Sequence, residues 1–318
     1  MTENKALKIA VLGAGSLGCA LGARLALGGS QVILVNHRQA QVDALKAHGL
    51  TLHEAGQTWR VPVQAAIDCS ALGPVDLVIV LVKSFDTRAA IQGAAPLLGP
   101  DTVVLSLQNG LGHEDVLADA VGRERLLAGK TYVGGVLTAP GVVAAGTMGK
   151  ATFVGEPYAS EGAALSPRAL RIAQVFNAAG LATTVSPNIM GTIWDKLLVN
   201  VATGALSGIT RLPYGKLYAV PEVEACAVAA VQEAMAVARA QGVRLGITDP
   251  LEAWRVAGRG LSDDFRASML QSLDKGSITE VDYINGAVVA LGARLGVPTP
   301  VNRTLVACIK GIEKGLPA

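Results

Sequence analysis

The sequence predicts an α/β fold, in which an N-terminal doubly wound parallel sheet is followed by an all-helical C-terminal domain. Up to about residue 187, short apolar runs alternate with helical patterns, as in proteins whose parallel strands are joined by helices. Beyond Ser186-Pro187-Asn188, nearly every segment has helical periodicity. The expected domains are therefore residues 1–187 and 188–318.

The N-terminal elements follow from this alternation. The expected strands are Lys8–Leu12, Gln31–Val35, Leu77–Leu81 and Thr102–Leu107, and the expected helices are Ser16–Leu27, Gln39–His48, one from Asp86 and one around His113–Val121. Continuous apolar strands such as Leu77–Leu81 are typical of parallel sheets covered on both faces. Leu50–Val63 is expected to form a hairpin outside the alternation. Further strands (LLAGKTYVGGVL, TFVGE, ATTV) and a helix at Ser166–Ala179 complete the domain.

The C-terminal domain is expected to consist of six helices. Their predicted positions are Ile189–Ser207, Val220–Gln241, Pro250–Gly258, Phe265–Leu273, Val281–Leu295 and a last helix that starts near Asn302. Pro298 and Pro300 separate the last two, because proline interrupts a helix interior.

Composition excludes several classes of protein. Hydrophobic residues make up 51% of the chain and charged residues 16%, which argues against disorder. The apolar runs are too short for a membrane span of about 20 residues. A net charge of +2, with no Lys/Arg cluster, argues against nucleic-acid binding. Four scattered cysteines and no secretory leader predict a cytoplasmic protein, and no His/Cys spacing predicts a metal site.

The hexapeptide GAGSLG at positions 13–18 matches G-x-G-x-x-G and lies between a predicted strand and a predicted helix. Gly13 allows the tight turn, Gly15 lets the backbone approach a pyrophosphate, and Gly18 lets the helix pack closely. Ser16 and Leu17 begin the helix, whose free N–H groups attract phosphate. This context predicts a Rossmann-type dinucleotide site, the alternative being a glycine-rich turn that binds nothing.

The end of the second strand indicates which dinucleotide binds. An acidic residue there would bond the ribose 2′-hydroxyl, whereas an arginine accommodates a 2′-phosphate. The sequence has Asn36-His37-Arg38 and no acid. We therefore expect NADP(H), with Arg38 favoured over His37. The alternative is that Arg38 is a solvated residue at the start of the next helix.

Polar residues follow two more predicted strands. Lys83 comes directly after LVIVLV, and Asn109 after VVLSLQ. Ligands of doubly wound sheets bind beyond the carboxyl ends of the strands, so we expect both residues near nicotinamide or substrate. The alternative is that both are ordinary loop residues.

The C-terminal domain contributes further candidates. Lys196 and Asn200 are four residues apart and share one helix face. A lysine among leucines and valines is usually an exposed side chain, so this pair alone does not establish catalysis. Ser268 and the segment TEVDYING at 279–286 form a second polar set, whose alternative role is helix capping.

Taken together, these motifs resemble the ketopantoate reductase family, the NADPH-dependent 2-dehydropantoate 2-reductases. In chain order they are VLGAGSLG, VILVNHR, LVKSFDT, QNGLG, NIMGTIWDKLLVN, SML and TEVDYING. The pair W-x-K-L-x-x-N and T-E-x-D-x-I-N-G is the most specific part of the resemblance. It implies a Rossmann domain, a helical domain, an active site in the cleft between them and a homodimer formed through the helical domain.

The resemblance also implies roles for single residues. Lys196 matches the catalytic lysine, which acts as general acid, and Glu280 matches the acid that interacts with it. The remaining matches are Lys83 and Asn109 near nicotinamide and the catalytic centre, Asn200 and Ser268 at the substrate, and Arg38 at the 2′-phosphate, where one extra residue leaves the alignment with His37 ambiguous.

Three positions depart from the family pattern. Gly204 and Tyr214 stand where many members have asparagine, and Ser272 replaces an acid. The expected function is NADPH-dependent reduction of ketopantoate to pantoate, for pantothenate and coenzyme A synthesis. The alternatives are a reductase of another 2-oxo acid, a 3-hydroxyacid dehydrogenase and a non-catalytic NADP-sensing protein.

Overall fold

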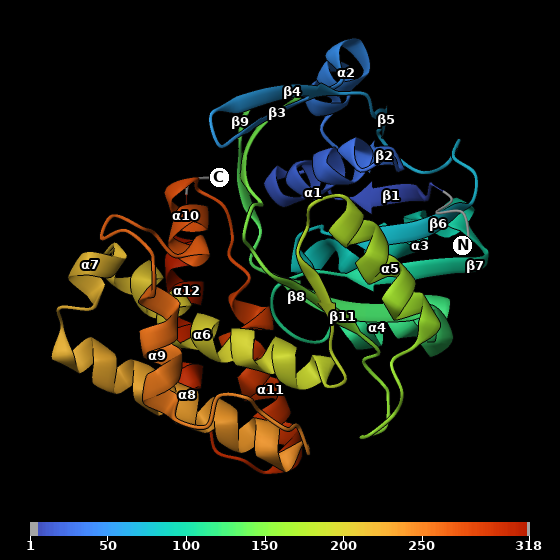
Figure 1. The fold of residues 1–318 in the computed structure, drawn as a ribbon. Helices are drawn as coiled ribbons and strands as arrows, with labels where there is room; N and C mark the ends of the chain where they lie inside the picture. Colours follow the sequence, from blue (N-terminus) through green and yellow to red (C-terminus); the bar gives the residue numbers. More distant parts are fainter. Residues whose placement is uncertain (1–5, 317–318) are drawn as a thin grey trace. The chain divides into compact units, whose positions relative to one another are not determined.

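A computed structural model describes residues 6–316, and their contacts divide into two compact units. The first unit comprises the residues up to Gln108 together with His113–Ile189. The second comprises the short segment Asn109–Gly112 and the residues from Met190 onward. Figure 1 shows strands and helices in the first unit and helices in the second, so the predicted fold class is confirmed.

The first unit contains a sheet of eight strands in the order β12-β11-β8-β7-β6-β1-β2-β5. These strands are β1 (Lys8–Leu12), β2 (Gln31–Val35), β5 (Gln64–Ala66), β6 (Val75–Val80), β7 (Leu98–Ser106), β8 (Leu126–Thr131), β11 (Thr152–Gly155) and β12 (Thr183–Val185). All neighbours are parallel except β8 and β11. The sheet is therefore mostly parallel, as predicted, with one antiparallel pair.

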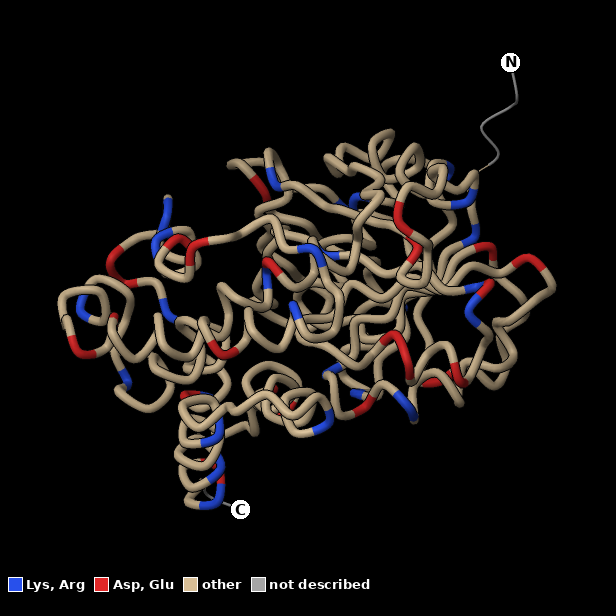
Figure 2. The backbone as a smooth tube through the Cα atoms, turned by 90° about the horizontal axis from the view of Figure 1, so that it is seen from below, with Lys and Arg blue, Asp and Glu red and all other residues tan. Residues whose placement is uncertain are grey.

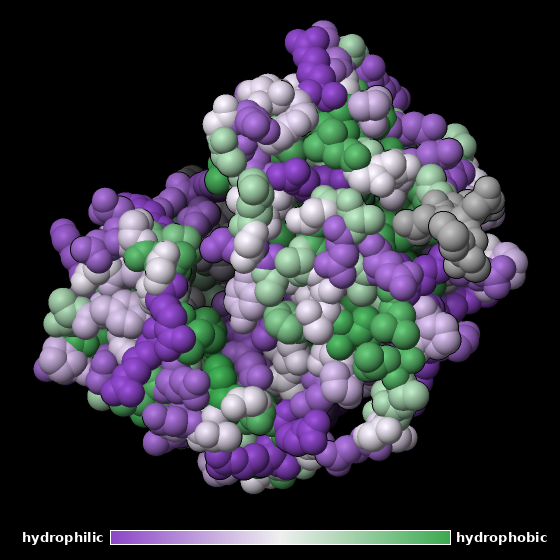
Figure 3. All heavy atoms as spheres, viewed as in Figure 1, coloured by the Kyte–Doolittle hydropathy of each residue, from purple (hydrophilic) through white to green (hydrophobic). Residues whose placement is uncertain are grey.

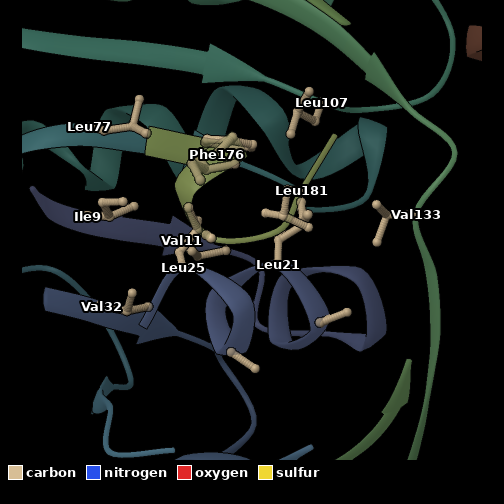
Figure 4. Close-up of a cluster of buried hydrophobic side chains, with 14 of the residues drawn as sticks. Ile9, Val11, Leu21, Leu25, Val32, Leu77, Leu107, Val133, Phe176 and Leu181 are labelled. Carbon is tan, nitrogen blue, oxygen red and sulfur yellow. The ribbon is translucent and has the colours of Figure 1, made fainter. Parts of the chain in front are cut away.

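Helices cover both faces of this sheet. They are α1 (Ser16–Leu27), α2 (Gln39–His48), α3 (Thr87–Gly93), α4 (His113–Val121) and α5 (Pro167–Ala178). Alternate residues of β1 point to opposite faces. Ile9 and Val11 belong to a buried cluster with side chains of α1 and α5, including Phe176 (Figure 4), and Leu12 belongs to a second cluster with Ile91 of α3 and Leu117 of α4.

A second sheet of four strands has the order β4-β3-β10-β9. Its strands are β3 (Leu50–Glu54), β4 (Gln57–Val61), β9 (Gly134–Ala139) and β10 (Val142–Gly146). The pair β3–β4 is the expected hairpin. The rest differs from expectation, because LLAGKTYVGGVL forms two strands in different sheets and β10 was not predicted. At Gly135, β9 passes close to α1, since a Cβ atom there would stand 3.2 Å from the Ser16 carbonyl oxygen.

Glu54 fastens the second sheet to α1. Its carboxylate accepts hydrogen bonds from the backbone N–H and the hydroxyl of Thr147, and it pairs with Arg24 of α1. Burial by itself raises the pKa of this carboxyl, but the bonds from Thr147, Arg24 and Met148 outweigh burial and hold the pKa below its usual 4.5. The ionised form is therefore the one that the fold stabilises.

The second unit is built from helices. They are α6 (Ile189–Thr210), α7 (Tyr214–Leu217), α8 (Pro221–Ala240), α9 (Pro250–Gly258), α10 (Ser268–Asp274), α11 (Asn285–Leu295) and α12 (Pro300–Lys314). The helix expected at Val281–Leu295 is interrupted, because Val281–Tyr283 forms a 3₁₀ turn and Ile284 leaves helical geometry at φ −110°, ψ −95°. Pro300 occupies the first turn of α12, where its missing N–H costs nothing.

The surface carries few charges. Figure 2 shows Lys/Arg and Asp/Glu dispersed along both parts of the chain, and on the face in Figure 3 apolar residues form small patches between hydrophilic ones. Within residues 6–316, no helix is long and apolar enough to cross a membrane. All four cysteines are free thiols.

Candidate functional site

The glycine-rich loop joins β1 to α1 and is held by the neighbouring strands. Gly13 has φ +97°, and its N–H donates to the carbonyl oxygen of Val35 at 3.1 Å. A Cβ atom at Gly13 would stand 2.6 Å from the backbone nitrogen of Val82. A Cβ atom at Gly18 would collide with the Gly13 carbonyl oxygen. Both glycines are therefore required by the packing of the loop itself.

Gly15 has a different environment. Apart from its chain neighbours, no atom of residues 6–316 lies within 4 Å of the position where its Cβ would be. The loop next to α1 is therefore open at Gly15, and the first turn of α1 holds no acidic side chain. Ser16 begins that turn, and its hydroxyl accepts from the N–H of Leu137 on β9 at 3.1 Å. An open glycine before a helix N-terminus fits the pyrophosphate of a dinucleotide.

Asn36 connects the end of β2 to this loop. Its side-chain amide donates to the carbonyl oxygen of Ala14 at 2.8 Å, and its side-chain oxygen accepts from the N–H of Arg38 at 2.9 Å. The side chains of His37 and Arg38 are exposed. The imidazole of His37 and the guanidinium of Arg38 therefore lie at the end of β2, beside the glycine loop, where a ribose phosphate could reach them.

Lys83 follows β6 and is also near the glycine loop along the backbone. Lys83 is exposed and directly precedes the short 3₁₀ turn Ser84–Asp86. The preceding residues form the wall of the loop, because Leu81 N–H donates to the Leu12 carbonyl oxygen at 2.8 Å and Val82 lies against Gly13. The carboxyl ends of β1 and β6 thus bring Lys83 and the loop to one edge of the sheet.

Asn109 lies in the second unit, although it follows β7 of the first in chain order. The next residue, Gly110, has φ +92°, and a Cβ atom there would stand 2.5 Å from the Tyr283 carbonyl oxygen. Leu111 N–H donates to that same oxygen at 3.0 Å. Asn109 therefore adjoins residues that pack against Tyr283, three residues beyond Glu280.

Glu280 is half-buried and directly precedes the 3₁₀ turn Val281–Tyr283. Its segment is fastened to α12 on both sides. Thr279 donates from its N–H and its hydroxyl to Glu313 at 2.7 Å, and the Asn285 amide donates to Asn302 at 2.9 Å. The Thr279 hydroxyl also accepts from Val281 N–H at 3.2 Å, whereas Glu280, the residue at the N-cap of the 3₁₀ turn, makes no side-chain capping bond. Residue spacing does not indicate these α12 partners, because Glu313 and Asn302 are distant in the chain.

Lys196 and Asn200 lie on α6 and are half-buried among buried neighbours such as Trp194 and Leu197. Ser268 is the first residue of α10 and is exposed. Within the described residues, neither the Asn200 amide nor the Ser268 hydroxyl has a hydrogen-bond partner in the protein. The second unit therefore offers an ammonium group together with two polar groups that a ligand can bond.

The three positions that depart from the family pattern are all engaged by packing or hydrogen bonds. Gly204 lies under Met269, and the Tyr214 hydroxyl donates to Thr203 Oγ1 at 3.0 Å. Ser272 donates to the Ser268 carbonyl oxygen at 3.1 Å.

A separate cavity of about 480 Å³ in the second unit is lined by aromatic residues, including Tyr218 and Trp254. None of the predicted catalytic, cofactor or substrate residues lines it. Among the described residues, no group of three or more His, Cys, Asp or Glu side chains could hold a metal ion.

The sequence matches two family profiles. They are described as "Ketopantoate reductase PanE/ApbA", over residues 9–157, and "Ketopantoate reductase PanE/ApbA C terminal", over residues 188–313. The chain is 35% identical to a 2-dehydropantoate 2-reductase of Halobacterium salinarum, over 96% of this chain and 98% of that protein. The similarity therefore extends through both units.

Solved structures show the same extent of similarity. A PanE/ApbA family ketopantoate reductase from Ralstonia eutropha JMP134 is 37% identical with a TM-score of 0.87, over 96% of this chain and 98% of that chain. A D-mandelate dehydrogenase solved as a ternary structure with NADH and anilino(oxo)acetate is 27% identical with a TM-score of 0.89, over 97% and 99%. Both folds match nearly end to end.

Proposed function

Because the chain belongs to the ketopantoate reductase family of oxidoreductases, we propose that it reduces ketopantoate (2-dehydropantoate) to pantoate with NADPH. The observation that carries the proposal is that each unit separately presents groups suited to one part of this reaction. The first unit has a glycine loop that is open at Gly15, and the second has Lys196 on the same helix face as the Asn200 amide. Residues 1–187 would bind the dinucleotide, and 188–318 would bind the substrate.

A bound nicotinamide dinucleotide would supply the hydride that reduces the ketone carbon. As negative charge develops on the ketone oxygen, the Lys196 ammonium stabilises it and donates a proton, which gives the 2-hydroxy acid. Asn200 and Ser268 bond the substrate and orient its ketone. Glu280, fixed through its segment to α12, helps order the Lys196 ammonium.

The first unit would hold the dinucleotide. The loop at 13–18 receives the pyrophosphate, and Arg38 receives the 2′-phosphate, because its planar guanidinium can bond two phosphate oxygens. Lys83 and Asn109 would lie near nicotinamide. In this assignment Asn36 is a positioning residue, since it links Arg38 to the glycine loop.

The decisive test is loss of the proton donor. Lys196→Ala is expected to lower kcat for NADPH-dependent ketopantoate reduction by about 10²–10⁴-fold with the fold intact, because that is what general acid catalysis contributes. The measurement is NADPH oxidation followed by absorbance, with circular dichroism as the check on folding. Lys275→Ala removes an exposed lysine of the same unit and serves as the control. Near-normal turnover by Lys196→Ala would contradict the assignment of Lys196 as the proton donor.

A second candidate is a reductase of another 2-oxo acid. The similarity to a D-mandelate dehydrogenase, together with Gly204, Tyr214 and Ser272, supports it. A panel of 2-oxo acids in the same assay separates the two candidates, and absence of any turnover would instead favour an NADP-sensing protein.

The setting of the enzyme is part of the proposal. With ketopantoate as substrate, the pantoate formed would serve pantothenate and coenzyme A synthesis. We expect a cytoplasmic homodimer, and light scattering coupled to size-exclusion chromatography measures the oligomeric state directly.

A further inference from the structure

Three successive carbonyl oxygens around Lys83 are bonded within the first unit. The Val82 oxygen accepts from the Gln108 side-chain amide at 3.0 Å, the Lys83 oxygen from the Asp86 N–H at 2.8 Å, and the Ser84 oxygen from the Thr87 hydroxyl at 2.8 Å. Lys83 itself is exposed. The backbone on both sides of this exposed lysine is therefore fixed by bonds to the interior of the unit.

One side-chain amide connects two of these bonds. Gln108 Nε2 donates to Thr87 Oγ1 at 2.8 Å as well as to the Val82 carbonyl oxygen, and Gln108 Oε1 accepts from the Ser106 hydroxyl at 3.2 Å. Because a carbonyl oxygen can only accept, this orientation of the amide is the one that satisfies each partner. Gln108, which follows β7, thus connects the segment after β6 to the first residue of α3.

Burial makes this network hard to replace by water. Thr87 and Ser106 are each 2% exposed, and Gln108 is half-buried. Loss of the Thr87 hydroxyl removes the acceptor of one Gln108 N–H and a donor to the Ser84 carbonyl oxygen, which is costly in a buried place. Lysine carries its charge on a flexible four-carbon chain, so its placement depends on a fixed backbone.

We propose that Gln108 and Thr87 are positioning residues for Lys83, because they fix the backbone at 82–84 and so orient its ammonium toward the bound dinucleotide. The inference rests on the proposed function, which puts a dinucleotide at the glycine loop. The segment borders this loop, since the Val82 backbone nitrogen stands 2.6 Å from the position of a Cβ at Gly13. Thr87, at 2% exposure, acts through the backbone and not by touching the ligand.

The first test removes one hydroxyl. Thr87→Val keeps the shape of the side chain but loses both hydrogen bonds, and we expect the Kd for NADPH to rise about threefold to tenfold. Thr87→Ser keeps the hydroxyl and is expected to stay within about twofold of the unmodified protein. Fluorescence titration without substrate measures the Kd, and circular dichroism verifies folding. Equal Kd values for Thr87→Val and the unmodified protein would overturn the proposal.

A double-mutant cycle tests whether Thr87 acts through Lys83. Lys83→Ala alone is expected to raise the Kd for NADPH about tenfold, because a charge-assisted hydrogen bond is lost. Thr87→Val added to Lys83→Ala should then raise it by less than about twofold, since the group that Thr87 positions is already absent. Gln108→Met, which removes the amide, should show the same non-additivity. Independent, multiplying effects in both cycles would overturn the proposal.

A matched control separates positioning from general loss of stability. Thr183 is also buried, and its hydroxyl donates to the Leu181 carbonyl oxygen at 2.7 Å on β12, an edge strand of the same sheet. Thr183→Val is expected to lower stability in urea about as much as Thr87→Val and to leave the Kd for NADPH unchanged. Equal weakening of NADPH binding by both variants would overturn the positioning role.

The binding experiments also separate this inference from the proposed function. If the unmodified protein binds neither NADPH nor NADH, the proposed function and this inference are both overturned. Normal NADPH affinity in Lys83→Ala overturns this inference alone and leaves the proposed reduction standing. The expected non-additivity in a protein that turns over none of the 2-oxo acids supports this inference and overturns the proposed reduction.

Discussion

The candidate groups of the two units are of different kinds. In the first unit the site is a contiguous loop of glycines and backbone N–H groups, and its shape is determined by where a Cβ atom cannot stand. In the second unit the candidate groups are side chains on four separate segments of the chain, at Asn109, on α6, on α10 and at Glu280. We therefore expect the glycine loop to be sensitive to added atoms, and the candidate groups of the second unit to be sensitive to lost contacts between distant segments.

The largest expected effect is on the glycine loop. Gly13→Ala places a Cβ at φ +97° and 2.6 Å from Val82, so we expect the free energy of unfolding to fall by about 3 kcal/mol or more. The methyl group added by Gly15→Ala would project into open space, so this variant should change the free energy of unfolding by less than about 0.5 kcal/mol. Urea denaturation measures both changes.

Gly15→Ala, which should leave stability nearly unchanged, is expected to have a large effect on dinucleotide affinity. Gly15→Ala is expected to weaken NADPH binding more than about tenfold, as followed by fluorescence titration, because its methyl occupies the space proposed for the pyrophosphate. A Gly15→Ala protein that binds NADPH normally would contradict the placement of the cofactor.

The next effect concerns the contact between Gly110 and Tyr283. Gly110→Ala is expected to destabilise the protein by about 1–3 kcal/mol more than Gly112→Ala, with a lower kcat and little change in NADPH affinity. Both glycines have φ near +90°, but a Cβ at Gly112 meets no atom within 4 Å. The difference therefore isolates the contact with the Tyr283 carbonyl. Equal destabilisation by the two variants would mean that backbone strain alone matters there.

A smaller effect is expected at the end of β2. Arg38→Ala should raise KM for NADPH by about tenfold to a hundredfold and leave KM for NADH nearly unchanged, because only the former carries the 2′-phosphate. Steady-state kinetics with both cofactors gives the ratio. His37→Ala is the matched comparison: if it shifts the ratio and Arg38→Ala does not, the phosphate ligand is His37.

The smallest expected effect is on the pH dependence of stability. The folded pKa of Glu54 is lowered, so its contribution is present above the unfolded pKa near 4.5 and is lost as pH falls through the folded value. We expect a shallower loss of stability in acid for Glu54→Gln, measured by denaturation at several pH values. Glu222→Gln, at an exposed position of α8, is the control and should keep the original slope.

Much of the fold could be predicted from local patterns. The bounds of β1, α1, β2 and α2 agree with the prediction. The spacing of apolar residues changes abruptly at the ends of these elements, and glycines mark several of the ends. β9 and β10 were not predicted as a second sheet, since their short runs of glycine and alanine carry weak periodicity. The break at Ile284 was missed because Val281–Leu295 keeps a helical pattern across it.

The candidate site divides in the same way. The roles of Gly13 and Gly18 in packing could be inferred from spacing, since the motif itself encodes the turn. The contacts of Gly110 with Tyr283 and of Gly204 with Met269 join residues far apart in the chain, and no pattern near either glycine signals its partner. Such contacts depend on tertiary packing, which single-sequence patterns do not contain.

The tetrapeptide Asn109–Gly112 limits how this protein can be divided or recombined. It lies among residues that build the first unit, yet its contacts are with the second. A fragment that begins at Met190 would leave the Tyr283 carbonyl without the Leu111 N–H, and a hybrid that exchanges only the C-terminal residues between relatives would pair a foreign tetrapeptide with the new helices. Modular exchange would succeed best when these four residues travel with the C-terminal part.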